Sequence, residues 1–108
     1  MPDQLVQLRA VPPFKDPHGR VRWDPNQGRL QLFASDLPPL PAGAVYRVRF
    51  RLDDGRLQTG PTLYPGTDGA VSGAVAIGGD APRLQEIQVV LDPPARPVLA
   101  GRADGGAP

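Results

Sequence analysis

The chain has 108 residues, which is enough for one domain and too few for two. It contains no cysteine, so disulfide scaffolds, cysteine-ligated zinc sites and thiol catalysis are excluded. Twelve basic and 11 acidic residues leave a net charge of +1. That balance predicts no general attraction to nucleic acid or to a membrane surface.

The 13 glycines and 15 prolines are clustered between apolar runs, a distribution typical of turns between strands. Prolines recur too often for helices, and the long proline-free window 42–60 alternates with a period of two. No stretch approaches the roughly 20 apolar residues that a transmembrane helix needs. The N-terminus has no signal-peptide pattern, so we expect any targeting segment to lie outside this chain.

In chain order, short apolar runs bounded by glycine and proline predict about eight strands. The predicted strands are Leu5–Val11, Arg20–Trp23, Arg29–Ser35, Val45–Asp53, Arg56–Thr59 with a continuation at Leu63–Tyr64, Ala70–Ile77, Leu84–Asp92 and Val98–Ala100. Short connections favour antiparallel pairing. We therefore predict an all-β fold, an antiparallel two-sheet β-sandwich of the immunoglobulin-like or a related Greek-key type, with a small barrel as the alternative. The sandwich is expected to span residues 1–101, and 102–108 to form a flexible tail.

The fourth predicted strand, Val45–Asp53, has the clearest pattern, because large apolar residues alternate with arginines. Tyr46 shares its predicted face with the apolar residues, so we expect it in the core. Trp23 alternates with arginines on an earlier strand and is expected to face inward too.

Catalytic and metal-binding patterns are not found in the sequence. His18 is the only histidine, it lies in a predicted turn, and no GxSxG elbow accompanies it. Glu86 is the only glutamate, which excludes a paired-glutamate glycosidase centre. The Asp-Gly pairs, such as Asp68-Gly69, lack calcium-loop spacing and are interpreted as turns. We predict that the protein is not an enzyme and needs no cofactor or metal.

Arg47, Arg49 and Arg51 form the most distinctive feature, since in a strand all three point to the same face. Guanidinium groups spaced in this way suit an anionic ligand, a polysaccharide or a protein partner. The alternative is a solvated outer face whose charges are balanced by aspartates on neighbouring strands. Nucleic-acid binding is not expected, because few aromatic residues accompany the arginines.

The sequence contains several short motifs in a characteristic order over residues 23–101. They are Trp23-Asp24-Pro25, the segment 37–43 (LPPLPAG) followed by Tyr46, then Gly60, Asp68-Gly69, the run 89–93 (VVLDP) and the closing run 97–101 (PVLAG). This order resembles the C-terminal extracytoplasmic domain of the RskA-type anti-sigma factors. The sequence departs from that family at Arg49, where the family has tryptophan, and at Ala95-Arg96, where it has a glycine pair.

The resemblance implies a membrane-anchored parent protein that regulates sigma-factor-dependent transcription, with this domain as its outer sensor or interaction module. The anchoring transmembrane helix would then lie outside this chain, and the partner would be a protein or a cell-envelope ligand. A stand-alone β-sandwich that binds an anionic ligand or polysaccharide through Arg47, Arg49 and Arg51 is the second hypothesis. A structural or assembly module is the third, and exposed strand edges would allow a homodimer.

Overall fold

The computed structural model describes residues 3–66, 68–76, 83–92 and 95–102. All the regular structure in these residues is β-strand, which confirms the all-β prediction. The strands are β1 (Gln4–Ala10), β2 (His18–Asp24), β3 (Arg29–Ser35), β4 (Val45–Leu52), β5 (Leu57–Leu63), β6 (Val71–Ala76), β7 (Leu84–Asp92) and β8 (Arg96–Arg102). The described residues contain no helix that is long and apolar enough to cross a bilayer.

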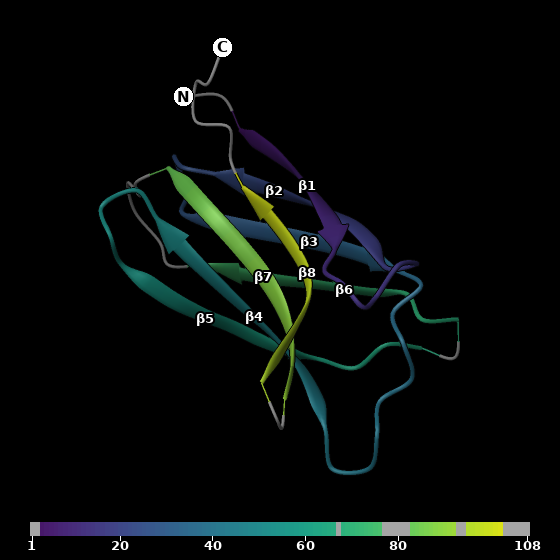
Figure 1. Cartoon of the computed structure of the whole chain (residues 1–108). Helices are drawn as coiled ribbons and strands as arrows, with labels where there is room; N and C mark the ends of the chain where they lie inside the picture. Colours follow the sequence, from purple (N-terminus) through teal and green to yellow (C-terminus); the bar gives the residue numbers. More distant parts are fainter. Residues whose placement is uncertain (1–2, 67, 77–82, 93–94, 103–108) are drawn as a thin grey trace.

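The eight strands form one hydrogen-bonded sheet in the order β5-β4-β7-β8-β1-β2-β3-β6, and every pairing is antiparallel. The chain's first and last strands, β1 and β8, are therefore neighbours in the middle of the sheet. Figure 1 shows the sheet folding back on itself, so that β7 and β8 cross in front of β3 and β6. The end strands β5 and β6 approach each other, and the sheet is nearly closed into a barrel.

A division into two separate sheets is not confirmed, because the β1–β8 pairing joins the two halves into a single sheet. That pairing covers only two residue pairs, Arg9 with Ala100 and Ala10 with Leu99. By contrast, β1 pairs with β2 over six residue pairs. The backbone N–H of Val11 extends the junction by donating to the Val98 carbonyl oxygen over 2.9 Å. The structure is thus closer to the small barrel that the sequence analysis offered as the alternative.

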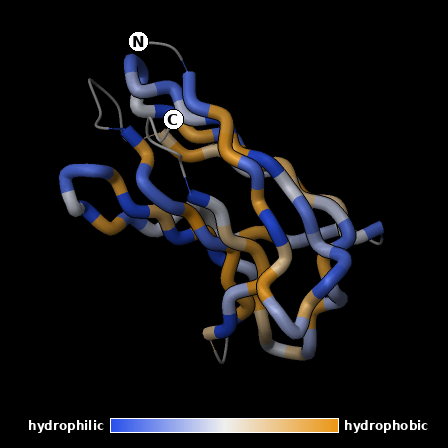
Figure 2. The backbone as a smooth tube through the Cα atoms, turned by 45° about the horizontal axis from the view of Figure 1, so that its top comes forward, coloured by the Kyte–Doolittle hydropathy of each residue, from blue (hydrophilic) through white to orange (hydrophobic). Residues whose placement is uncertain are grey.

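Strand alternation builds the core, as the bands of apolar and polar residues along the tube in Figure 2 indicate. Trp23 and Tyr46 are both fully buried, which confirms their predicted inward orientation. The Trp23 ring lies 6.0 Å from the Phe50 ring, centroid to centroid, so β2 in one half of the sheet contacts β4 in the other. A tilted aromatic pair of this kind adds about 0.5–1.5 kcal/mol to the burial of its surface.

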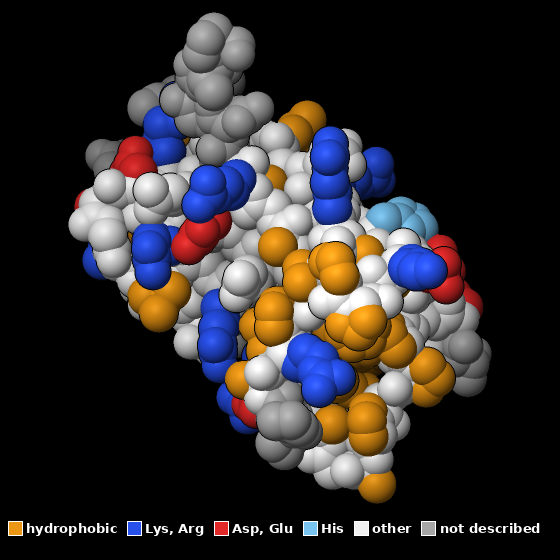
Figure 3. All heavy atoms as spheres, viewed as in Figure 1, with side chains coloured by type: hydrophobic (Ala, Val, Ile, Leu, Met, Phe, Trp, Pro, Cys, Tyr) orange, Lys and Arg blue, Asp and Glu red, His pale blue; other side chains and the backbone are white. Residues whose placement is uncertain are grey.

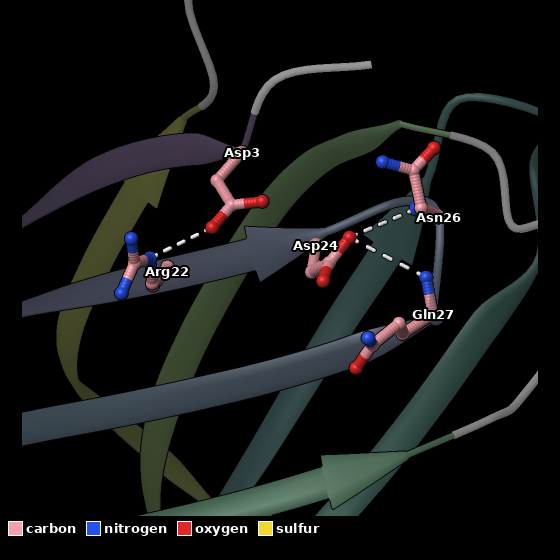
Figure 4. Close-up of polar contacts among 5 residues, drawn as sticks. All are labelled: Asp3, Arg22, Asp24, Asn26 and Gln27. Atoms are coloured by element: carbon pink, nitrogen blue, oxygen red, sulfur yellow. Dashed lines mark hydrogen bonds and ion pairs between the residues drawn. The ribbon is translucent and has the colours of Figure 1, made fainter.

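Aspartates organise the tight turns, which confirms the interpretation of Asp54 and Asp68 as turn residues. In the turn from β2 to β3, Asp24 Oδ1 accepts the backbone N–H of Asn26 at 3.0 Å and of Gln27 at 3.4 Å (Figure 4). Asp54 and Asp68 accept the N–H groups two residues further on in the same way. The Arg56 backbone N–H that bonds to Asp54 lowers the pKa of that carboxyl. Asp104-Gly105 lies outside the described residues.

The buried side chain of Gln4 links β1 to the beginning of β7. Its Oε1 accepts the Leu84 N–H at 2.8 Å, and its Nε2 donates to the Leu84 carbonyl oxygen at 3.4 Å. The described pairs between β7 and β8 end at Glu86 with Arg102, two residues after Leu84 along β7. One side-chain amide therefore makes both hydrogen bonds of a strand bridge at the end of the barrel.

The proline-rich segment between β3 and β4 is fastened to the core by Tyr46. The Tyr46 hydroxyl donates a 2.6 Å hydrogen bond to the Pro38 carbonyl oxygen, and Leu37 is buried beside the core. Gly69 contacts the same segment, because the Leu37 N–H donates to its carbonyl oxygen at 3.1 Å. Burial also raises the pKa of the Tyr46 hydroxyl above its ordinary value of 10.0.

Replacing Tyr46 by phenylalanine is expected to lower the free energy of unfolding by about 1–3 kcal/mol, because the Pro38 carbonyl loses its donor. The effect should also depend on pH. Since the folded-state pKa is the higher one, the unfolded chain ionises first, and wild-type stability falls as the pH rises above 10. Urea unfolding of both proteins at pH 7 and pH 10.5 checks this. A stability difference that does not shrink at high pH would contradict it.

The strand boundaries agree with the predicted ones within a few residues, and β3 and β7 agree residue for residue. The largest difference is at β8, which runs from Arg96 to Arg102 instead of covering only Val98–Ala100. Arg102, predicted as the first tail residue, therefore belongs to a strand. Residues 103–108, the remainder of the predicted tail, lie outside the described residues, as does Ile77 of the predicted sixth strand.

Candidate anion-binding face

The three arginines of β4 point outward, as the sequence pattern predicts. The apolar residues between them, Val48 and Phe50, are buried at 1% exposure each. The side chains of Arg47 and Arg51 are about half exposed, at 46% and 48%. Figure 3 shows Lys and Arg side chains spread over the face seen there, with Asp and Glu side chains beside only some of them.

The three arginines differ in their acidic neighbours. Arg47 Nε lies 3.2 Å from Asp92 Oδ2, and Arg51 Nη1 lies 3.8 Å from Glu86 Oε1. Such exposed ion pairs contribute only about 0–1 kcal/mol each, yet they balance the charge locally. Arg49, between them, has no carboxylate within 4.0 Å among the described residues. The expectation of a charge-balanced surface thus holds for Arg47 and Arg51, and Arg49 remains available to a ligand.

A single cross-strand row connects Arg49 to an arginine that the sequence analysis did not single out. Arg49 pairs with Gln88, Gln88 with Ala100, and Ala100 with Arg9. We call these four residues the arginine row. Adjacent strands are about 4.8 Å apart, so the row spans about 14 Å from β4 to β1. Like Arg49, Arg9 has no carboxylate within 4.0 Å among the described residues.

A hollow of about 380 Å³ lies beside the row, between β1 and β8. We call it the β1–β8 hollow; it is lined by Leu5, Val6, Gln7, Arg9, Ala100, Gly101 and Arg102. The side chain of Arg102 is 84% exposed, and its only acidic neighbour in the described structure is Glu86, 3.9 Å away. Two guanidinium groups and an amide are thus available to one ligand at the mouth of the hollow.

The next row on the same outer surface adds an aromatic ring. Gln7 pairs with Arg20 of β2, and Arg20 pairs with Phe33 of β3. The Arg20 guanidinium carbon lies 5.6 Å from the centre of the Phe33 ring, which is within cation–π range. Phe33 is 47% exposed although it is a large apolar residue. Two residues further along β2, on the same face, Arg22 is instead paired with Asp3 at 2.8 Å (Figure 4).

These groups can hold anions. Guanidinium groups are always charged and offer planar pairs of donors that match carboxylates, sulfates and phosphates. Within the described parts of the chain, no three histidine and carboxylate side chains come together as a metal site requires. His18 lies on β2 with its side chain exposed, 3.5 Å from Asp36.

Sequence reasoning missed Arg9 and Arg102 for different reasons. Arg9 alternates with apolar residues in the first predicted strand, so its outward orientation could be predicted from the sequence. The residues beside it on adjacent strands could not. Only the pairing of the chain's first and last strands brings it to Ala100. Arg102 is the first residue of the run 102–108 that the sequence analysis predicts to be a tail. The pairing of Glu86 with Arg102 carries the strand one residue past Gly101.

Comparisons of the chain with protein-family models, with curated proteins and with solved structures find no match.

Proposed function

We propose that this chain is a non-enzymatic binding domain that holds an anionic partner against the outer surface of its barrel. The observation that carries the proposal is that Arg49 and Arg9 occupy one cross-strand row without a carboxylate neighbour in the described structure. Arg22 and Arg47 have such neighbours at 2.8 and 3.2 Å, whereas Arg20, next to the arginine row, also has none among the described residues. A guanidinium group without a carboxylate neighbour can bind an anionic ligand without first giving up an ion pair.

The proposal predicts that replacing both Arg9 and Arg49 by alanine weakens binding of heparin, a soluble polyanion, about tenfold, or ~1.4 kcal/mol. Each exposed guanidinium contributes less than about 1 kcal/mol, and the two effects are expected to add because the residues are about 14 Å apart. Retention on a heparin column in a salt gradient and calorimetric titration both measure the change.

The matched control is the double variant Arg22→Ala and Arg56→Ala. It removes the same net charge from arginines that already have carboxylate partners, Asp3 and Asp54. Loss of binding in the first variant only would support a site at the arginine row. Equal loss in both variants would mean that only the overall charge matters, and absence of heparin binding by the wild type would overturn the proposal.

The second candidate function is the extracytoplasmic sensor domain of a membrane-anchored anti-sigma factor. The most specific part of the resemblance forms one structural unit, and this favours the hypothesis. Segment 37–43 and Tyr46 form one unit, joined by the 2.6 Å hydrogen bond from the Tyr46 hydroxyl to Pro38. In this hypothesis the anionic partner is a cell-envelope component outside the cytoplasm.

A genetic experiment tests this second candidate. Deletion of the full-length gene should raise transcription from promoters of one sigma factor encoded beside it, and expression of the full-length protein should restore repression. Unchanged sigma-dependent transcription after deletion would contradict the anti-sigma role. It would leave the anion-binding proposal unaffected, because that proposal depends only on the isolated domain.

A further inference from the structure

The surface beside the β1–β8 hollow combines cationic and apolar side chains. This combination suits a ligand that carries both anionic and apolar groups. Gln7, Arg20 and Phe33 occupy one row across β1, β2 and β3, which spans about 10 Å at ordinary strand spacing. Gln7 also lines the hollow, so the row and the hollow are continuous. At the edge of the hollow, Leu5 is 79% exposed.

Phe33 is the most informative residue of this surface. It points outward from the middle of the sheet, since β3 pairs with β2 on one side and with β6 on the other. Its ring is half-exposed even though the Arg20 guanidinium lies over it, 5.6 Å from the ring centre. An outward aromatic ring next to a cation can contact the apolar C–H face of a sugar while the cation pairs with an acidic group on that sugar.

We propose that this surface binds a short oligosaccharide that carries carboxylates, with Arg9, Arg20 and Arg102 on the carboxylates and Phe33 against a sugar ring. The inference rests on the proposed function in that it assigns a ligand class to the same anion-binding face. It extends that face from the arginine row to β2 and β3.

An acidic peptide fits this surface less well than a sugar. Extended peptides commonly bind by adding a strand to an open sheet edge, where unpaired backbone groups give the affinity. Here β2 and β3 each have a strand paired on both sides, so Arg20 and Phe33 offer side chains and no open strand edge.

A nucleic acid fits less well too. Its affinity comes mainly from many neutralised phosphates, and bases need aromatic rings for stacking. The whole chain has a net charge of +1, and Phe33 and Tyr64 are the exposed aromatic residues among the described ones. Arg20 and Phe33 can serve one or two sugar units but not a long polyphosphate chain.

The test is an NMR titration of the ¹⁵N-labelled chain with trigalacturonate, alongside maltotriose as a neutral sugar and hexaglutamate as an acid without a sugar. We expect trigalacturonate to shift the amides of Gln7, Arg9, Arg20 and Phe33, and maltotriose to cause no comparable shifts. Phe33→Ala and Arg20→Gln should each weaken trigalacturonate binding about fivefold or more. Leu57→Ala is the control, because Leu57 is 63% exposed on β5 and does not line the β1–β8 hollow.

The outcomes separate this inference from the broader proposal. If hexaglutamate binds as well as trigalacturonate and Phe33→Ala changes nothing, the ligand class is wrong while the anion-binding face stands. If trigalacturonate binds without shifting residues of β1 and β2, the location is wrong. Heparin retention that depends on Arg9 and Arg49 decides the proposed function by itself. A Phe33→Leu variant, which remains apolar but lacks the ring, distinguishes loss of the aromatic contact from misfolding.

Discussion

Replacing Trp23 by alanine is expected to lower the free energy of unfolding by about 3–5 kcal/mol. The indole is fully buried and contacts Phe50 in the opposite half of the sheet, with 6.0 Å between ring centroids. Its removal leaves a cavity where β2 and β4 meet. Because small domains are stable by only about 5–15 kcal/mol, the variant should lie near its unfolding midpoint under mild denaturant.

Urea unfolding followed by circular dichroism measures this change and does not depend on the tryptophan signal. Leu5→Ala is the control, since Leu5 is 79% exposed and its truncation should change stability by less than about 0.5 kcal/mol. If Trp23→Ala cost no more than Leu5→Ala, the contact between the two halves would not hold the barrel together. Trp23→Phe should recover part of the loss, because it restores apolar volume at the same place.

Replacing Gly101 by alanine is expected to cost about 1–3 kcal/mol or more, through a steric conflict between the two central strands. A Cβ at this position would lie 2.5 Å from the Gln7 carbonyl oxygen and 2.8 Å from Val6 Cγ1. The first contact is with backbone, which no rotamer change relieves. β8 must therefore move away from β1, and the β1–β8 hollow must change shape with it.

Gly43→Ala is the matched control for this substitution. Gly43 has a φ of +81° but no atom within 4 Å of an added Cβ, so only backbone strain of about 1–2 kcal/mol applies. We expect faster hydrogen exchange of the β1 amides and weaker heparin binding in the Gly101 variant only. If the two variants lost equal stability and the hydrogen exchange of the β1 amides did not change, the close approach of β8 to β1 would not be the cause of the loss.

The fold was predictable where local pattern decides it. The alternation at Tyr46, Val48, Phe50 and Leu52 determines which face of β4 is buried, whatever the neighbouring strands are. Turn chemistry at Asp54 and Asp68 likewise acts over two residues. Whether eight antiparallel strands form two sheets or one depends on the two residue pairs between Arg9–Ala10 and Leu99–Ala100. Contacts between the ends of a chain leave no local signal in its sequence.

The candidate site was predictable only in part for the same reason. The outward orientation of Arg49 followed from alternation, but its lack of a carboxylate neighbour depends on which residues lie across from it. Glu86 faces Arg51 rather than Arg49 because of the β4–β7 register. Arg9 and Phe33 were on predicted strands, yet their roles emerged only when pairing placed Gln7 beside Arg20 and Arg20 beside Phe33.

The position of the two terminal strands has a mechanical consequence. β1 begins and β8 ends on the same side of the barrel, and the two strands run antiparallel beside each other. A force that pulls the two ends of the chain apart would break the few hydrogen bonds between β1 and β8 one after another instead of all together. The barrel should therefore yield at low force, and the first element to open would be the β1–β8 hollow. A ligand that spans both strands would raise that force.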